Sequence, residues 1–210
     1  GIYIFDYSNL KKYLTEDENN PDSSNDFGKN IIPAMLANKE KMMSFSFDGY
    51  WKDVGTVFSL WEANMDLIDT PPKFNLSDSK WTIYSKNSAR PPHFVGTNAE
   101  ILSSTIGEGC EIDGKINHSV ISEGVIVQTG SKITDSVIMP GAYIGKNVTI
   151  NKSVIGPNAV IKDGAVVGSE SPDADTSRIN DMCTHKIVLV EGGAIIGEKE
   201  KIACGSMIQA

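Results

Sequence analysis

Aliphatic residues recur along the second half of the chain in steps of six, six and five residues. The series is Ile121, Val127, Ile133, Ile138, Ile144, Ile150, Ile155, Ile161 and Val167. Every third member therefore lies 17 residues further on, which gives three interleaved rows with one period. Such a pattern predicts a coil with three sides, each of which adds one row of aliphatic side chains to a prism-shaped core.

Small or turn-forming residues fall between the aliphatic positions, where the coil must bend. They are Gly124, Gly130, Gly141, Asn147, Asn158 and Gly164. Glycine and asparagine tolerate the positive φ that sharp corners need, whereas an α-helix would show a spacing near 3.6 and few glycines. We predict a left-handed parallel β-helix of hexapeptide repeats over residues 99–210, with a shortened corner at Asp113–Lys115. A polar loop over residues 168–185 precedes closing strands at residues 186–197 and 201–208.

The first part of the chain alternates between strand and helix patterns. Strands are predicted at residues 1–5 and 43–47, and helices at residues 7–17, about 28–38 and 57–69. Thr56 is a suitable N-cap for the last helix, and the prolines after Thr70 end it. Residues 73–98, rich in Pro, Ser and Asn, are interpreted as a linker. This order is typical of the edge of an α/β sheet followed by the β-helix.

The composition of the chain argues against several classes of function. The net charge of −8 and the pI near 4.9 give no basic face for nucleic acid, so we expect no such partner. The three cysteines lie far apart without a CxxC pair, which favours a reducing, cytoplasmic compartment over disulfides or zinc. No apolar stretch predicts a membrane span or a leader. Because the chain opens directly on an apolar strand pattern, we expect it to be a piece of a longer protein.

Several motifs in this order carry a resemblance to a known family. They are GIYIF, SSNDFGKNIIP, GYWKDVGT and SLWEANMDL, followed by the hexapeptide repeats. The set resembles the carboxy-terminal half of bacterial glucose-1-phosphate adenylyltransferases. The resemblance implies that residues 1–72 are the C-terminal remnant of a catalytic nucleotidyltransferase domain, without its Gly-rich nucleotide loop. It also implies a transfer from ATP to glucose 1-phosphate that yields ADP-glucose and pyrophosphate, with Mg²⁺ as cofactor.

The resemblance also implies roles for individual residues. Asp53 matches a Mg²⁺-binding, catalytic carboxylate, and the alternative is an Asp that caps the turn before Thr56. Trp51 and Lys52 match positions on the sugar-phosphate side, although the family often has Arg at the Lys52 position and Lys52 could instead face solvent. Tyr3 and Asp26 match residues that contact the glucose. Their structural alternatives are a core tyrosine and a helix N-cap.

Two other functions stay open. One is a non-catalytic regulatory subunit of the same enzyme, although the intact YWKDVG motif favours the catalytic type. The other is a hexapeptide-repeat acyltransferase, which would use a histidine as general base. His118 lies at an irregular corner of the repeat, while His93 and His185 show no evident partner in the sequence. The family resemblance further implies a homo-oligomer, a tetramer, formed through the β-helix, and an allosteric site between the two domains.

Overall fold

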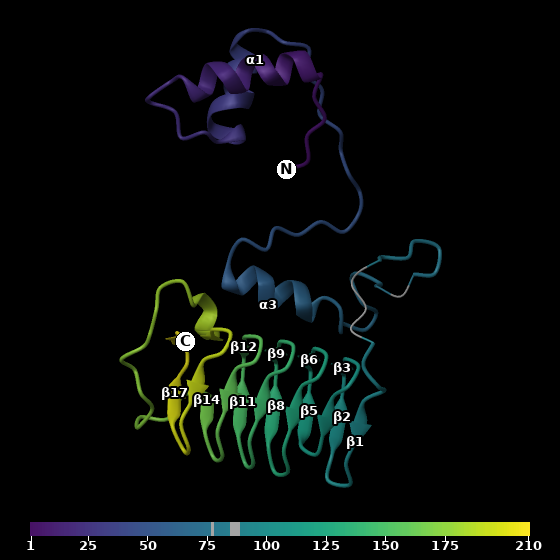
Figure 1. Ribbon diagram of the computed structural model, residues 1–210, viewed down its shortest axis with the longest axis vertical. Helices are drawn as coiled ribbons and strands as arrows, with labels where there is room; N and C mark the ends of the chain where they lie inside the picture. The colour runs from purple at the N-terminus through teal and green to yellow at the C-terminus, as the bar shows by residue number, and fades with distance from the viewer. Residues whose placement is uncertain (77, 85–88) are drawn as a thin grey trace. The chain divides into compact units, whose positions relative to one another are not determined.

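The structure is a computed structural model that describes residues 1–76, 78–84 and 89–210 (Figure 1). The chain forms two compact units, residues 1–49 and residues 50–210. Each unit has its own packing.

The first unit is a small helical cluster. It contains α1 (Tyr7–Glu18), a π-helical turn η1 (Phe27–Ile31) and α2 (Ile32–Ala37). Asp6 caps α1, because its side chain accepts hydrogen bonds from the amides of Ser8 and Asn9. The core is small and consists of Tyr13, Ile31 and Met35, with Phe5 and Met42 packed against them. Both helices predicted from the sequence in this region are confirmed.

The two strands predicted for this unit do not form. Residues 1–5 are a continuous apolar run and residues 43–47 alternate between apolar and polar side chains, but neither segment is a strand. Ile4 is 99% exposed and Phe45 is 89% exposed. A strand is stabilised by hydrogen bonds to a neighbour, and the described residues offer these two segments no neighbouring strand. Both segments are rich in apolar residues, but the prediction that they form strands was wrong.

The second unit is dominated by a parallel β-helix with three sheets of six strands each (Figure 1). Sheet A contains β1 (Phe94–Val95), β4 (Glu111–Ile112), β7 (Ile126–Val127), β10 (Tyr143–Ile144), β13 (Val160–Ile161) and β16 (Ile195–Ile196). Sheet B contains β2 (Glu100–Leu102), β5 (Lys115–Asn117), β8 (Lys132–Thr134), β11 (Thr149–Asn151), β14 (Val166–Ser169) and β17 (Lys201–Ala203). Sheet C contains β3 (Thr105–Ile106), β6 (Val120–Ile121), β9 (Val137–Ile138), β12 (Ser153–Ile155), β15 (Val188–Val190) and β18 (Met207–Ile208).

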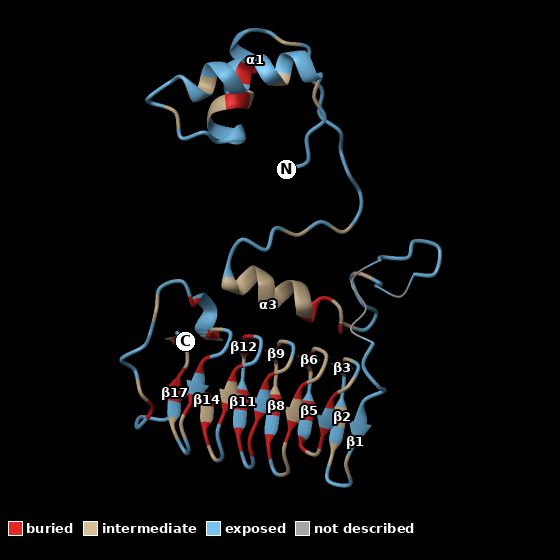
Figure 2. Ribbon diagram, in the orientation of Figure 1, coloured by how far each residue is buried: buried red, intermediate tan, exposed pale blue. Residues whose placement is uncertain are grey.

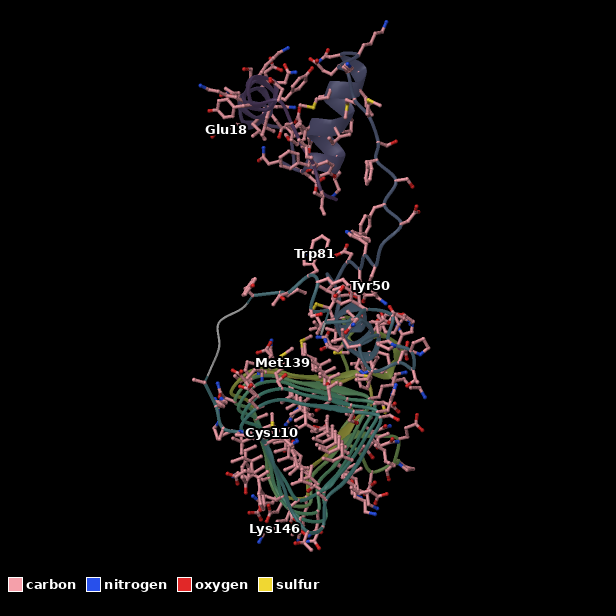
Figure 3. The ribbon with its side chains drawn as sticks, turned by 90° about the vertical axis from the view of Figure 1, so that its right-hand side faces the viewer. Glu18, Tyr50, Trp81, Cys110, Met139 and Lys146 are labelled. Carbon is pink, nitrogen blue, oxygen red and sulfur yellow. The ribbon has the colours of Figure 1, made fainter. Side chains whose placement is uncertain are left out.

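The predicted aliphatic rows are the inward rows of these sheets. Ile121 pairs with Ile138, and Ile138 with Ile155, in sheet C. The other two rows are in register in the same way, and all of these side chains are buried in one continuous core. Figure 2 shows the buried stripes that run along the strands, and Figure 3 shows side chains filling the space between the three sheets. The parallel β-helix of hexapeptide repeats is confirmed.

The corners also follow the prediction. The six glycine and asparagine positions named from the sequence all have positive φ, from 55° at Asn147 to 76° at Gly130. The corner at Asp113–Lys115 is shortened, since Ile116 follows Ile112 after four residues. Gly114 is buried there, and a Cβ atom on it would lie 2.8 Å from the carbonyl oxygen of Ser131. Glycine therefore fits the tight approach of neighbouring coils at this corner.

The predicted downstream features are present as well. β15 to β18 extend the three sheets and end them, as expected for closing strands. The loop between β14 and β15 contains a short 3₁₀-helix, η2 (Thr184–Lys186). Two other residues of this loop pair with the last coil through isolated bridges, Asp175 with Ile202 and Ile179 with Ser206. The loop is therefore fastened to the end of the prism by backbone pairing.

The helix α3 (Val57–Met65) covers the outer face of sheet C (Figure 1). Its N-terminus has a capping box, in which the Thr56 side chain accepts from the Ser59 amide and the Ser59 side chain accepts from the Thr56 amide. The outward positions of sheet C beneath it are apolar. They are Val120, Val137, Val154 and Leu189. Burial of this row explains why the helix belongs to the compact unit of the β-helix.

The compact units differ from the domain limits expected from the sequence. The expected boundary was residue 72. The two compact units instead meet after Gly49, because α3 packs on the β-helix. The first strand of the β-helix is Phe94–Val95, which lies inside the expected linker. In the part of the chain that the structure describes, no helix has the length and apolar character needed to cross a membrane.

Candidate functional site

The segment that carries three of the predicted site residues runs from Tyr50 into the start of α3. Trp51 is 58% exposed, so its ring is available to a ligand. Asp53 is exposed, and its Oδ1 accepts a hydrogen bond from the Gly55 amide at 3.2 Å. This bond is the turn-capping role foreseen as the alternative for Asp53, and it holds the carboxylate at the head of α3.

Lys52 does not face solvent. Its Nζ lies 2.7 Å from Glu62 Oε2 and 2.9 Å from Asp66 Oδ2, and its side chain is 22% exposed. Both carboxylates belong to the last turns of α3 or the residue after it. Lys52 is thus bound to the helix that follows it.

Asp66 is the centre of this arrangement, and sequence reasoning missed it. Its side chain is 3% exposed, and its Oδ2 accepts from the Tyr50 hydroxyl at 2.9 Å as well as from Lys52. Its Oδ1 accepts from Lys73 Nζ at 2.6 Å. The available signal was an acidic residue inside the apolar run Met-Asp-Leu-Ile, because a carboxylate placed among apolar neighbours requires partners.

These partners decide the charge of Asp66. Burial alone would raise the pKa of a carboxyl group, but hydrogen bonds from Lys73, Lys52 and Tyr50 outweigh it and lower the pKa of Asp66 to about 2. Desolvation alone would lower the pKa of Lys52, but its hydrogen bonds to Glu62 and Asp66 outweigh this and raise it. Burial, together with the bond to Asp66, also raises the pKa of the Tyr50 hydroxyl.

A pH-dependent stability follows from the lowered pKa of Asp66. Its folded pKa lies below the unfolded value, so its stabilisation is complete above the unfolded pKa of about 4 and is lost as the pH falls toward 2. We expect the urea midpoints of the wild type and Asp66→Asn to differ most near neutral pH and to converge below about pH 4. Equilibrium unfolding at a series of pH values measures this. A difference that stays constant down to pH 3 would contradict the charge-based explanation.

The remaining predicted residues, Tyr3 and Asp26, lie in the first unit. The Tyr3 ring stacks on Phe27 with centroids 5.7 Å apart, and the side chain is 46% exposed. Asp26 caps η1 by accepting from the Lys29 amide at 2.8 Å. Phe27 directly follows Asp26, so these two candidates are neighbours at one end of the small unit. Asp26 has the N-cap contact foreseen as its alternative, and its exposed carboxylate faces solvent.

A magnesium site is not complete within the described residues. No group of three or more His, Cys, Asp or Glu side chains there is arranged to hold a metal ion. Asp53 supplies one hard oxygen donor of the type that Mg²⁺ prefers, and Mg²⁺ commonly takes its other ligands from water and phosphate. Asp53 would therefore supply one ligand of a Mg²⁺ ion whose other ligands come from water and phosphate.

Two histidines relevant to the acyltransferase alternative, His118 and His185, have side-chain partners. His118 Nδ1 lies 2.6 Å from Asp135 Oδ1, on the next coil at the same corner. The carbonyl oxygen of Asp135 accepts from the Trp61 indole at 2.7 Å. The ring of His185 stacks on Phe58 at 3.9 Å. Both histidines thus border the docking site of α3, where they have structural contacts.

Sequence comparisons define the class of protein to which these features belong. Residues 1–70 match the family described as "Nucleotidyl transferase", and residues 91–190 match "GlmU-like, C-terminal hexapeptide". The chain therefore joins a nucleotidyltransferase segment to a hexapeptide β-helix.

Comparison with individual proteins points to a particular enzyme within this class. The chain is 53% identical over 175 residues to a glucose-1-phosphate adenylyltransferase of Bacillus cytotoxicus, an alignment that covers 83% of this chain and 46% of the relative. It is 56% identical over 131 residues to the enzyme of that name from Clostridium perfringens, covering 62% of this chain and 34% of the relative. The resemblance to glucose-1-phosphate adenylyltransferases is confirmed, and the chain spans less than half the length of these relatives.

Proposed function

We propose that this chain is the carboxy-terminal part of a glucose-1-phosphate adenylyltransferase acting in glycogen synthesis. The observation that carries the proposal is the 53% identity over 175 residues, which include segments of both domains. In the proposed reaction a phosphate oxygen of glucose 1-phosphate attacks the α-phosphorus of ATP. The new P–O bond gives ADP-glucose, and the bond to the β-phosphate breaks to release pyrophosphate.

The residues of this chain would serve positioning and charge neutralisation, which dominate phosphoryl-type transfer. Asp53 would hold Mg²⁺, which neutralises developing charge on the phosphates. Trp51 offers an exposed face for the pyranose ring, and Lys52 offers a cation for the sugar phosphate. Tyr3 and Asp26 would contact the glucose, with the Asp26 carboxylate accepting from sugar hydroxyls.

A direct assay tests the proposal. The protein extended to the length of its relatives is expected to form ADP-glucose from ATP and glucose 1-phosphate when Mg²⁺ is present. Asp53→Asn is expected to lower kcat by about 100-fold or more, because a metal-binding charge is lost. Asp78→Asn, an exposed carboxylate of the linker, is the control and is expected to leave kcat unchanged.

We expect the 210-residue chain alone to be inactive, and ADP-glucose synthesis by it would contradict that expectation. Two further outcomes would contradict the proposed function itself. An inactive extended protein that still binds the substrates would favour the regulatory-subunit alternative. Binding of acetyl-CoA in calorimetry would favour the acyltransferase alternative, for which the His118–Asp135 pair is the relevant feature.

We further propose that the β-helix mediates self-association through sheet A. The outward row of this sheet is apolar on five of its six strands, and α3 covers sheet C instead. Phe94 is 67% exposed, Tyr143 37% and Ile195 61%. The outward row of sheet B is mainly polar by contrast, with Glu100, Lys115, Lys132, Thr149, Val166 and Lys201.

A second copy of the chain fits this face. A two-fold axis at the middle of sheet A would place each strand opposite its counterpart from the other end, so that β7 meets β10 and β4 meets β13. Ile126 would then meet Tyr143, and Asp113, which follows β4, would lie near Lys162, which follows β13. The apolar row and the opposite charges are both self-complementary in this arrangement. The proposed tetramer requires a second, different interface.

Sedimentation of the 210-residue chain tests this interface. Tyr143→Lys lies at a central strand and occurs twice in the pair, so we expect it to weaken the dimer by about ten-fold or more. Thr149→Lys on sheet B is the matched control and is expected to leave association unchanged. A chain that is monomeric at all concentrations, or two variants that associate equally, would rule out the sheet A interface.

The remaining proposals concern context. A cytoplasmic location agrees with Cys110, Cys183 and Cys204, all of which are free thiols. Allosteric regulation is proposed from the family resemblance. A change in the rate of ADP-glucose synthesis by the extended protein when a sugar phosphate or a nucleotide is added would support it, and a rate that no such compound changes would contradict it.

A further inference from the structure

The segment Tyr50–Asp53 carries three proposed site residues but is neither helix nor strand. Its backbone therefore receives no support from regular secondary structure. Side-chain contacts must fix it if Trp51 and Asp53 are to be held in one geometry, because catalysis by positioning tolerates little displacement.

Asp66 provides those contacts from the far end of α3. One oxygen, Oδ2, accepts from Tyr50 at 2.9 Å and from Lys52 at 2.9 Å. These two donors flank Trp51 on either side and lie just before Asp53. The segment is consequently held at two points on one carboxylate oxygen.

The other oxygen of Asp66 holds the chain where it leaves the helix. Oδ1 accepts from Lys73 Nζ at 2.6 Å, and the backbone carbonyl of Asp66 accepts from the Lys73 amide at 3.0 Å. The rings of Tyr50 and Phe74 stack with centroids 5.2 Å apart. Asp66 thus joins the chain before α3 to the chain after it, and the aromatic pair closes the same junction.

The helix that carries Asp66 is itself fixed to the β-helix. Met65, the residue before Asp66, is buried with Val137 and Val154 of sheet C. The Trp61 indole donates to the carbonyl oxygen of Asp135 at 2.7 Å. Figure 3 shows Tyr50 beside this helix, on the side of the prism where Met139 lies. A continuous set of contacts therefore runs from the outer face of sheet C through α3 to Asp66.

We propose that Asp66 is a positioning residue, which fixes the Tyr50–Asp53 segment to the β-helix so that Lys52 and Trp51 meet the phosphate and ring of glucose 1-phosphate. The inference rests on the proposed function for the identity of the substrate. Because Asp66 is buried, it acts through its bonds to Tyr50 and Lys52 and not by direct contact with the substrate. Glu62 alone cannot replace it, because Glu62 reaches Lys52 but is not bonded to Tyr50 or Lys73 in the structure.

The chain offers a matched control for the test. Asp69 also pairs with Lys73, at 3.2 Å, but its side chain is 37% exposed. Its only ion-pair partner among the described residues is Lys73, so it lacks the contact to Lys52 that Asp66 makes. Asp66→Asn and Asp69→Asn remove the same charge three residues apart. Only the first of them breaks the link to the site segment.

Backbone ¹⁵N relaxation of the 210-residue chain gives the first readout, because it reports the mobility of each amide directly. In Asp66→Asn the order parameters of residues 50–53 are expected to fall below about 0.6, while those of the β-helix strands stay near about 0.85. Asp69→Asn is expected to match the wild type at residues 50–53. Equal order parameters for this segment in both variants would overturn the proposal, whether or not the proposed enzymatic activity is found.

Steady-state kinetics of the extended protein give the second readout. Asp66→Asn is expected to raise the KM for glucose 1-phosphate by about ten-fold and to change the KM for ATP by less than about two-fold. A general loss of structure would lower kcat and affect both substrates, so parallel changes in both KM values would overturn the positioning role. If the wild-type extended protein makes no ADP-glucose, the proposed function fails by itself, and the relaxation result still decides whether Asp66 holds the segment.

Discussion

Replacing Ile144 by alanine is expected to lower the free energy of unfolding of the β-helix by about 2–5 kcal/mol. Ile144 is fully buried, and it lies in the middle of its inward row between Val127 and Ile161. Strands above and below hold the backbone in place, so the surrounding coils can close the resulting cavity only in part. The cost therefore includes both lost transfer free energy and a cavity.

Tyr143→Ala is the control for this prediction, because it removes a larger side chain from the neighbouring position of the same strand. Tyr143 points outward and is 37% exposed, so the loss of its ring should cost the monomer much less than the loss at Ile144. Guanidinium unfolding followed by far-UV circular dichroism, at concentrations below those that cause association, compares the two variants. Equal destabilisation at the two positions would contradict the assignment of inward and outward rows.

The inward rows could be predicted from the sequence because one geometrical condition fixes them. A three-sided coil repeats its inward position at a constant interval, and Ile121, Ile138 and Ile155 show that interval directly. The corners are equally readable, because positive φ selects glycine and asparagine. At each of these positions the local requirement, an aliphatic side chain or a positive φ, is the same one that the whole fold imposes.

The docking of α3 was harder to predict from the sequence, because it depends on the outward-facing residues of sheet C. The triplet Ser-Val-Ile recurs at residues 119–121, 136–138 and 153–155, and its valine points away from the prism. Outward valines in three successive coils mark a face that needs a cover, and Leu60 and Trp61 of α3 are among the side chains that supply it. Only the inward residue of each triplet was used in the prediction.

The candidate site shows a further limit of sequence reasoning. Asp53, Trp51 and Lys52 were found through family motifs, which identify residues but not the contacts among them. The bonds from Asp66 to Tyr50, Lys52 and Lys73 join parts of the chain that lie on both sides of a helix. Nothing in the spacing of these residues reveals that they meet, because the meeting depends on how α3 ends.

Replacing Val154 by aspartate is expected to release α3 from the β-helix while the prism stays folded. Val154 is fully buried under the helix, with Met65 and Trp61 in the same apolar cluster. An unpaired carboxylate at that point would cost roughly 3–5 kcal/mol, which undocking of the helix can relieve by admitting water. The inward neighbour Ile155 is unchanged, so the core of the coil keeps its packing.

Trp61 reports this release most directly, because its indole is bonded to Asp135 in the docked state. In a background with Trp51→Phe and Trp81→Phe, the emission of Trp61 is expected to shift to longer wavelength in Val154→Asp. The segment from Tyr50 to Leu76 should become accessible to protease at the same time. Thr149→Asp, an exposed outward position of sheet B, is the control and should change neither signal. If Val154→Asp unfolds the whole β-helix in the same step, α3 and the three sheets form one cooperative unit and the separation into a self-sufficient prism and a docked helix is wrong.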